Sequence, residues 1–174
     1  MMRYAVVTVL LLLAACGGPG YRDMTVPMTS MALFDPARYV GLWYEVARYP
    51  VWYQEGCADS RAIYAQTGPD TLSVRNICDR GGTVDEIGGT AKIVGPGRLR
   101  LRLDGVPVAA DYWVLWVDQD YRTAVVGTPS GRAAWILNRA PDISPDRLNA
   151  ARDVLRFNGY DLSRLNVKTP EGGQ

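Results

Sequence analysis

From Leu33 onward the chain is divided into short segments rich in β-branched and aromatic residues, which Gly, Pro, Asp or Asn interrupts about every eight to twelve residues. This spacing is typical of an antiparallel sandwich or barrel, because each turn ends one strand and begins the next. The turns are short enough for hairpins, so we expect neighbouring strands to pair in an up-and-down order. The eight predicted strands span residues 41–49, 60–66, 71–77, 84–94, 98–103, 112–117, 121–127 and 133–139.

One later segment has helical periodicity. Ser144 can cap this helix, Pro145 suits its first turn, and Asn158-Gly159 can end it. Its apolar stripe consists of Leu148, Ala151, Val154 and Leu155. We therefore predict an all-β fold, an eight-stranded antiparallel up-and-down barrel with one C-terminal α-helix packed outside it. A closed sheet of this size is just wide enough to hold one small ligand.

Residues 98–103 alternate strictly between Arg and Leu. We interpret this pattern as a strand with one buried and one solvated face rather than as a basic binding patch. The chain has 19 basic and 18 acidic side chains, a balance that does not favour nucleic acid as a partner. It contains no His, which excludes His-dependent nucleophilic sites and zinc sites with His ligands. No metal site and no cofactor are expected.

The first fifteen residues have the features of a secretory signal, with Arg3, an apolar run and small residues before Cys16. The run is too short to cross a bilayer, since eleven helical residues rise only about 16 Å. Leu13-Ala14-Ala15-Cys16 resembles the lipobox of bacterial lipoproteins, which implies that Cys16 is lipidated and anchors the protein in a membrane. Gly17 favours the outer membrane in that class. We therefore expect a signal at 1–15, a flexible tether at 16–31, the barrel and helix at 32–169 and a tail at 170–174.

Three segments in order resemble the motifs of the lipocalins, and most of all those of the bacterial outer-membrane lipocalins and their relative apolipoprotein D. Gly41-Leu42-Trp43-Tyr44-Glu45 resembles the first motif, and the segment from Asp118 to Tyr121 resembles the second, with Val117 where Thr is usual. The third motif centres on Arg139. The resemblance implies that Trp43 packs against Arg139 and closes one end of the barrel, where Gly41 permits a close backbone approach.

The resemblance also implies a ligand cavity, because the family places aromatic residues matching Tyr64 and Tyr112 inside the barrel. Strict alternation from Trp43, Tyr112 and Arg139 then assigns further side chains to the interior. The same rule predicts that Ala47 and Tyr49 also point into the barrel. The predicted ligand-binding lining is Glu45, Tyr64, Tyr112, Val114, Trp116, Trp135 and Leu137. This lining is mostly apolar and suits a lipophilic ligand, although some of the rings could instead simply fill a small barrel.

Lipidation of Cys16 would leave Cys57 and Cys78 as a pair in an oxidising compartment. The strand directions implied by the resemblance bring both to the open end, so we predict a disulfide between them. Apolipoprotein D instead joins its first cysteine to a C-terminal one, and this chain has no C-terminal cysteine. One lipocalin branch uses a cavity cysteine as an isomerase, but a disulfide and the lack of His argue against that chemistry here. No catalytic residue is expected.

We therefore favour a lipid-anchored, non-enzymatic lipocalin at the bacterial outer membrane that binds a fatty acid, lysophospholipid or similar small lipophile. Its partners would be that ligand and the membrane, and dimerisation is left open. The alternative is an envelope structural or interaction protein without a physiological ligand. The loop that contains Trp52 and Tyr53 would then be its contact surface.

Overall fold

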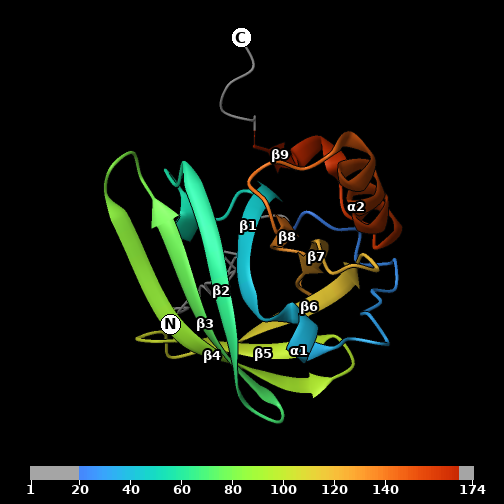
Figure 1. Ribbon diagram of the computed structural model, residues 1–174. Helices are drawn as coiled ribbons and strands as arrows, with labels where there is room; N and C mark the ends of the chain where they lie inside the picture. The colour runs from blue at the N-terminus through green and yellow to red at the C-terminus, as the bar shows by residue number, and fades with distance from the viewer. Residues whose placement is uncertain (1–19, 169–174) are drawn as a thin grey trace, which may run out of the picture.

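The computed structural model describes residues 20–168 and consists mainly of one antiparallel sheet that closes on itself (Figure 1). Closure follows because β1 pairs with β8 on one side and with β2 on the other. The strands are β1 (Gly41–Arg48), β2 (Asp59–Gly68), β3 (Thr71–Asp79), β4 (Val84–Gly95), β5 (Arg98–Leu103), β6 (Ala110–Val117), β7 (Thr123–Gly127) and β8 (Ala134–Asn138). The predicted eight-stranded up-and-down barrel is thus confirmed.

Short elements surround this barrel. The helix α2 (Pro145–Phe157) packs against its outside, as predicted, and buries Ala151 and Leu155. The prediction for Ser144 is only half right, because it occupies the N-cap position but its side chain makes no capping hydrogen bond. The elements that were not predicted are α1 (Pro36–Tyr39), the 3₁₀ helices η1 (Trp52–Gln54) and η2 (Leu162–Arg164), and β9 (Asn166–Val167), which pairs with β1. No helix in residues 20–168 is long and apolar enough to cross a membrane.

The predicted tether is wrong for residues 20–31, because this segment lies along the barrel beside α2 (Figure 1). The Arg22 guanidinium donates to the carbonyl oxygens of Asn158 and Val26, and Arg22 forms a β-bridge with Tyr160. Further along, the Met31 backbone N–H donates to the Val114 carbonyl at 2.8 Å. The side chains of Tyr21, Met28 and Met31 also pack against the hydrophobic clusters, so polar and apolar contacts together dock this segment. The predicted signal at 1–15 and the lipidated Cys16 lie outside the described residues.

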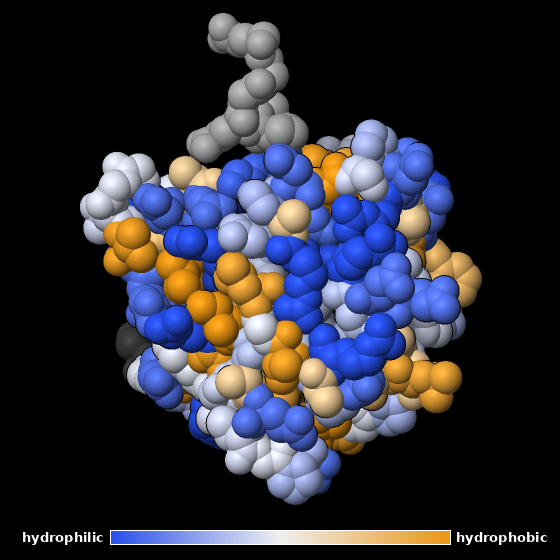
Figure 2. All heavy atoms as spheres, viewed as in Figure 1, coloured by the Kyte–Doolittle hydropathy of each residue, from blue (hydrophilic) through white to orange (hydrophobic). Residues whose placement is uncertain are grey.

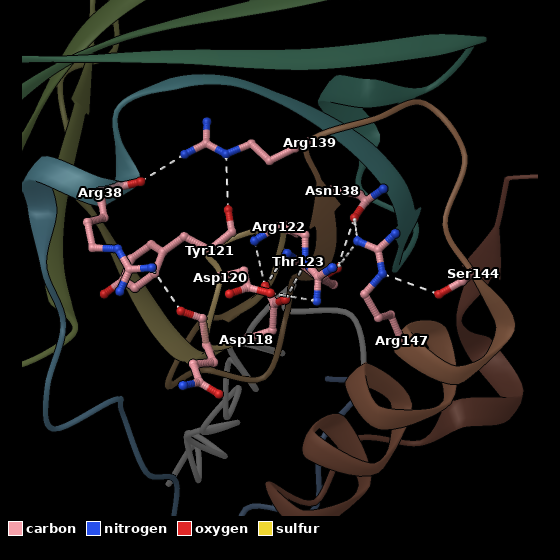
Figure 3. A network of polar contacts seen from close by, with 11 residues as sticks. Arg38, Asp118, Asp120, Tyr121, Arg122, Thr123, Asn138, Arg139, Ser144 and Arg147 are labelled. Carbon is pink, nitrogen blue, oxygen red and sulfur yellow. Dashed lines mark hydrogen bonds and ion pairs between the residues drawn. The ribbon is translucent and has the colours of Figure 1, made fainter.

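The third-motif arginine holds the closed end of the barrel together, as Figure 3 shows. Arg139 lies over the Trp43 ring at 3.8 Å from its centroid. Its guanidinium also donates to the carbonyl oxygens of Leu42 (2.9 Å), Arg38 (2.9 Å) and Tyr121 (3.2 Å). Gly41 lies beside this group with φ +98, and a Cβ there would be only 3.1 Å from Arg139 Nη1. One cation therefore joins β1, α1 and the β6–β7 turn.

The second motif builds the β6–β7 turn. The Asp118 carboxylate accepts hydrogen bonds from the backbone N–H groups of Arg122 (2.5 Å) and Thr123 (2.7 Å). Tyr121 has a φ of +57, which is unusual for a residue other than Gly, so the predicted strand at 121–127 begins only at Thr123. The Tyr121 hydroxyl in turn accepts from the backbone N–H of Asp35. Asp118 and Tyr121 thus hold the β6–β7 turn together and join it to the segment before α1.

The opposite end of the barrel is its mouth, where β1 ends and the β3–β4, β5–β6 and β7–β8 connections lie. The sulfurs of Cys57 and Cys78 form a disulfide there, which confirms the predicted pairing. This bond joins the loop after η1 to the end of β3. The described chain also begins at this end, because the Tyr21 backbone N–H donates to the carbonyl of Gly131 in the β7–β8 turn at 2.7 Å.

The buried side chains form two separate clusters, one inside the barrel and one between the barrel and α2. The inner cluster includes Trp43, Leu72, Leu99 and Val114, which fill the half near the closed end. The outer cluster includes Val46, Ile136 and Leu155. On the face drawn in Figure 2, hydrophobic atoms form small patches over β2–β4 that hydrophilic atoms interrupt. Because the inner cluster fills the half of the barrel near the closed end, the space for a ligand lies in the half near the mouth.

Candidate ligand-binding cavity

A cavity of about 620 Å³ occupies the mouth half of the barrel, a volume within the usual range for small-molecule sites. Its wall is mainly apolar, and its charged side chains lie near the mouth. The apolar wall includes Ala62, Tyr64, Ile77, Ile87, Leu101, Leu103, Val106, Val108, Ala110, Tyr112, Trp135 and Leu137. The charged residues are Glu45, Arg61, Arg80, Asp85, Glu86 and Asp111. Such a wall can bury a hydrocarbon chain and leave a polar group at the opening.

Five of the predicted lining residues contact this cavity: Glu45, Tyr64, Tyr112, Trp135 and Leu137. Val114 also faces the barrel interior, but it is completely buried in the packed half below the cavity. Successive side chains of a strand point to opposite faces of the sheet, and these residues lie on the face that points into the barrel.

Trp116 does not line the cavity, because it packs in the outer cluster against α2. Ala47 and Tyr49 also belong to the outer cluster. In both strands a β-bulge interrupts the alternation, between Val114 and Trp116 in β6 and between Glu45 and Ala47 in β1. A bulge adds one residue to a strand and so reverses the faces of all residues that follow. Strict alternation was therefore the wrong rule beyond these points.

Tyr64 and Tyr112 lie at the inner end of the cavity, and their hydroxyls form a cluster with that of Tyr39, which is buried outside the cavity wall. The Tyr64 hydroxyl donates to that of Tyr112 at 2.9 Å, and the hydroxyls of Tyr112 and Tyr39 are also 2.9 Å apart. Burial raises the pKa of Tyr64 to about 12 and the pKa values of Tyr39 and Tyr112 well above their usual value. All three phenols are therefore neutral in the physiological pH range.

The carboxylate of Glu45 holds η1 against the mouth. It accepts hydrogen bonds from Arg48 (2.8 Å) and from the Gln54 amide (2.7 Å), and Trp135 donates to the same amide at 2.9 Å. Burial raises the pKa of Glu45, and the hydrogen bonds from Arg48 and Gln54 oppose that shift. Glu45 is thus already paired within the protein, and its role in this geometry is to position the loop that carries Trp52 and Tyr53.

The mouth itself carries exposed apolar side chains. Trp52 is 86% exposed and Val108 is 70% exposed, and both also line the cavity. Tyr53 and Val84 add to the same rim. The predicted loop with Trp52 and Tyr53 therefore lies at the entrance, where a ligand must pass.

Several cavity residues were not named from the sequence. Leu101 and Leu103 could have been, because the Arg–Leu alternation of residues 98–103 already assigns them to the buried face. Tyr39 does not line the cavity but contacts its wall through Tyr112, and it gives no such signal, since it precedes the first motif and belongs to the four-residue helix α1. Its position becomes clear only from tertiary packing against Trp43 and Tyr64, with ring centroids 5.0 and 5.2 Å apart.

The sequence of this domain matches one described family over its whole barrel and the helix α2. Residues 34–170 match the lipocalin-like domain. The chain belongs to the lipocalin family. Lipocalins are generally non-enzymatic proteins that bind small hydrophobic ligands, and the cavity described above agrees with that property.

Sequence relatives of this lipocalin come from distant organisms. Temperature-induced lipocalin-1 of Arabidopsis thaliana is 34% identical over 77% of each chain. Outer membrane lipoprotein Blc of Escherichia coli is 31% identical over 92% of each chain. Among solved structures, insecticyanin of the tobacco hornworm Manduca sexta has a TM-score of 0.68 at 21% identity, with 88% of each chain covered. The likeness to insecticyanin supports the fold alone.

Proposed function

We propose that this lipocalin is a lipid-anchored protein of the bacterial outer membrane that binds a fatty acid, a lysophospholipid or a similar amphiphile. The observation that carries the proposal is the apolar cavity of about 620 Å³, with charged groups at its mouth. Burial of a methylene group contributes about 0.8 kcal/mol, so an acyl chain can supply most of the binding energy. At the opening Arg61 is ion-paired with Asp59 and Arg80 with Asp85, and the remaining N–H groups of these arginines can bind the anionic head of such a ligand.

Binding should depend on the open space in the barrel. Replacement of Ala62, which lines the cavity, by Phe is expected to weaken the binding of a fluorescent fatty acid at least tenfold, because the new ring occupies ligand volume. The matched control is Ala65→Phe, which adds the same ring to an exposed position of the same strand. Fluorescence titration and native mass spectrometry of delipidated protein measure the effect. Failure of the unmodified protein to bind any acyl ligand would refute the proposed function.

The position of Gly20 supports a membrane anchor near the mouth. Gly20 packs against the carbonyl oxygens of Ser130 and Gly131 in the β7–β8 turn. Cys16 is only four residues earlier, and four residues span at most about 14 Å. A lipid on Cys16 would therefore keep the entrance close to the membrane surface, where amphiphiles are concentrated. The family relationship to Outer membrane lipoprotein Blc agrees with this proposal.

Loss of the lipid should release the protein. When the full chain is expressed in a bacterium, we expect Cys16→Ser to move most of the protein from the membrane fraction to the soluble envelope fraction, because stable anchoring needs the acyl chains. Intact-mass measurement should show the lipid on the unmodified chain only. If the variant stays membrane-bound, or if the unmodified chain carries no lipid, the proposed anchoring is wrong.

The exposed rim favours a second candidate, an envelope interaction protein. Trp52 and Val108 are exposed apolar side chains, which can contact another macromolecule as well as line the entrance of the cavity. This candidate would be supported if the barrel bound no acyl ligand while Trp52→Ala abolished the capture of a specific envelope partner.

A further inference from the structure

The tyrosine cluster at the inner end of the cavity contains more donors than its hydrogen bonds use. Each phenol has one proton to donate and can accept through its oxygen. Two hydrogen bonds join Tyr39, Tyr64 and Tyr112, and within residues 20–168 their hydroxyls have no other partner. One of the three protons is therefore left without an acceptor in residues 20–168, although all three residues are buried.

The hydrogen bond between Tyr39 and Tyr112 can run in either direction, and of these two residues only Tyr112 lines the cavity. Tyr112 is the central member, and its oxygen accepts from Tyr64. If Tyr39 also donates to it, the remaining proton of Tyr112 faces the cavity that this residue lines, whereas Tyr39 is fully buried and is not part of the cavity wall. A hydroxyl that accepts hydrogen bonds is polarised by them and is a stronger donor.

The chemistry around this donor favours an uncharged acceptor. The positively charged residues that line the cavity, Arg61 and Arg80, lie toward its mouth. Arg139 is engaged by three backbone carbonyls and by the ring of Trp43 at the closed end. A ligand carboxylate beside these neutral phenols would lose its hydration and have no positively charged partner there. The carboxylate of a ligand therefore binds more favourably at the mouth. A neutral hydroxyl or carbonyl oxygen can accept the proton with a smaller loss of hydration.

We infer that Tyr112 makes this lipocalin selective for oxygenated acyl chains, in which the end that enters first carries a hydroxyl or keto oxygen. The anionic head remains near Arg61 and Arg80, the methylene groups lie along the apolar wall, and the distal oxygen accepts a hydrogen bond from Tyr112. This inference rests on the proposed lipid-binding function and names a class of ligand for the same cavity. Tyr39 and Tyr64 position the donor and are not themselves required to touch the ligand.

Three fatty acids of equal length test the inference: palmitic acid, 16-hydroxypalmitic acid and 2-hydroxypalmitic acid. Calorimetric titration of the delipidated protein should give about tenfold tighter binding for the 16-hydroxy acid than for palmitic acid, as expected for one additional buried hydrogen bond. The 2-hydroxy acid should have no such advantage, because its hydroxyl lies beside the carboxylate at the mouth.

Tyr112→Phe should remove this preference, because the ring is retained while its proton is lost. Tyr44→Phe, in β1 but outside the cavity wall, is the matched control and should keep the full preference. Tyr64→Phe keeps the Tyr112 proton but removes one of its donors, so the preference should fall to about threefold. Circular dichroism checks that each variant is folded, and Tyr64→Phe provides the test if Tyr112→Phe does not fold.

The outcomes separate the two proposals. Equal affinities of the unmodified protein for all three acids, or a preference that persists in Tyr112→Phe, would overturn the role of Tyr112 while leaving lipid binding intact. Absence of binding for all three acids would instead overturn the proposed function and this inference with it.

Discussion

Replacement of Trp43 by Ala is expected to lower the free energy of unfolding by about 3–5 kcal/mol, as for other large-to-small changes in a core. Trp43 is completely buried, its indole N–H donates to the Tyr39 carbonyl at 2.8 Å, and Arg139 lies over its ring. The variant would lose packing, a hydrogen bond and a cation–π contact together, at the point where the barrel closes. Urea denaturation followed by circular dichroism gives the measurement.

The control for this prediction is Trp43→Phe, which keeps an aromatic ring under Arg139 but removes the indole N–H. It should cost about half as much or less, because most of the packing survives. A loss below about 1 kcal/mol for Trp43→Ala would contradict the conclusion that this contact closes the barrel.

Removal of the disulfide by the double substitution Cys57→Ser and Cys78→Ser should lower the free energy of unfolding by about 3 kcal/mol. The two cysteines are 21 positions apart, and the bond restricts the unfolded chain by closing that loop. Guanidinium denaturation under oxidising conditions compares the two proteins.

A reducing agent provides the matched control for the disulfide. Reduction should destabilise the unmodified protein by about the same amount and should leave the double variant unchanged. If the double variant remained as stable as the oxidised protein, the bond would contribute only local order at the mouth.

Much of the architecture could be predicted from local sequence patterns. The spacing of turn residues and the alternation in residues 98–103 are set by the geometry of strands, which depends little on distant neighbours. The closing contact between Trp43 and Arg139 followed from the motif resemblance, and the structure shows it directly. The cysteine pairing was predicted in the same way, from strand directions that the resemblance supplied.

The details of the candidate site could not be predicted so well. Alternation correctly assigned Glu45 and Leu137 to the interior, but it failed for Tyr49 and Trp116 because each follows a β-bulge. A bulge is a feature of the pairing between two neighbouring strands, and this pairing is not visible in the local pattern of a single strand.

By itself, the sequence determined a closed eight-stranded barrel, the residues that close it and the cysteines that pair at its mouth, because these features depend on local periodicity and on short motifs. Only the tertiary structure decided which side chains surround the cavity, the docking of residues 20–31 on the barrel and the meeting of Tyr39 with Tyr64 and Tyr112. These contacts join residues far apart in the chain, and their geometry exists only once the barrel has closed.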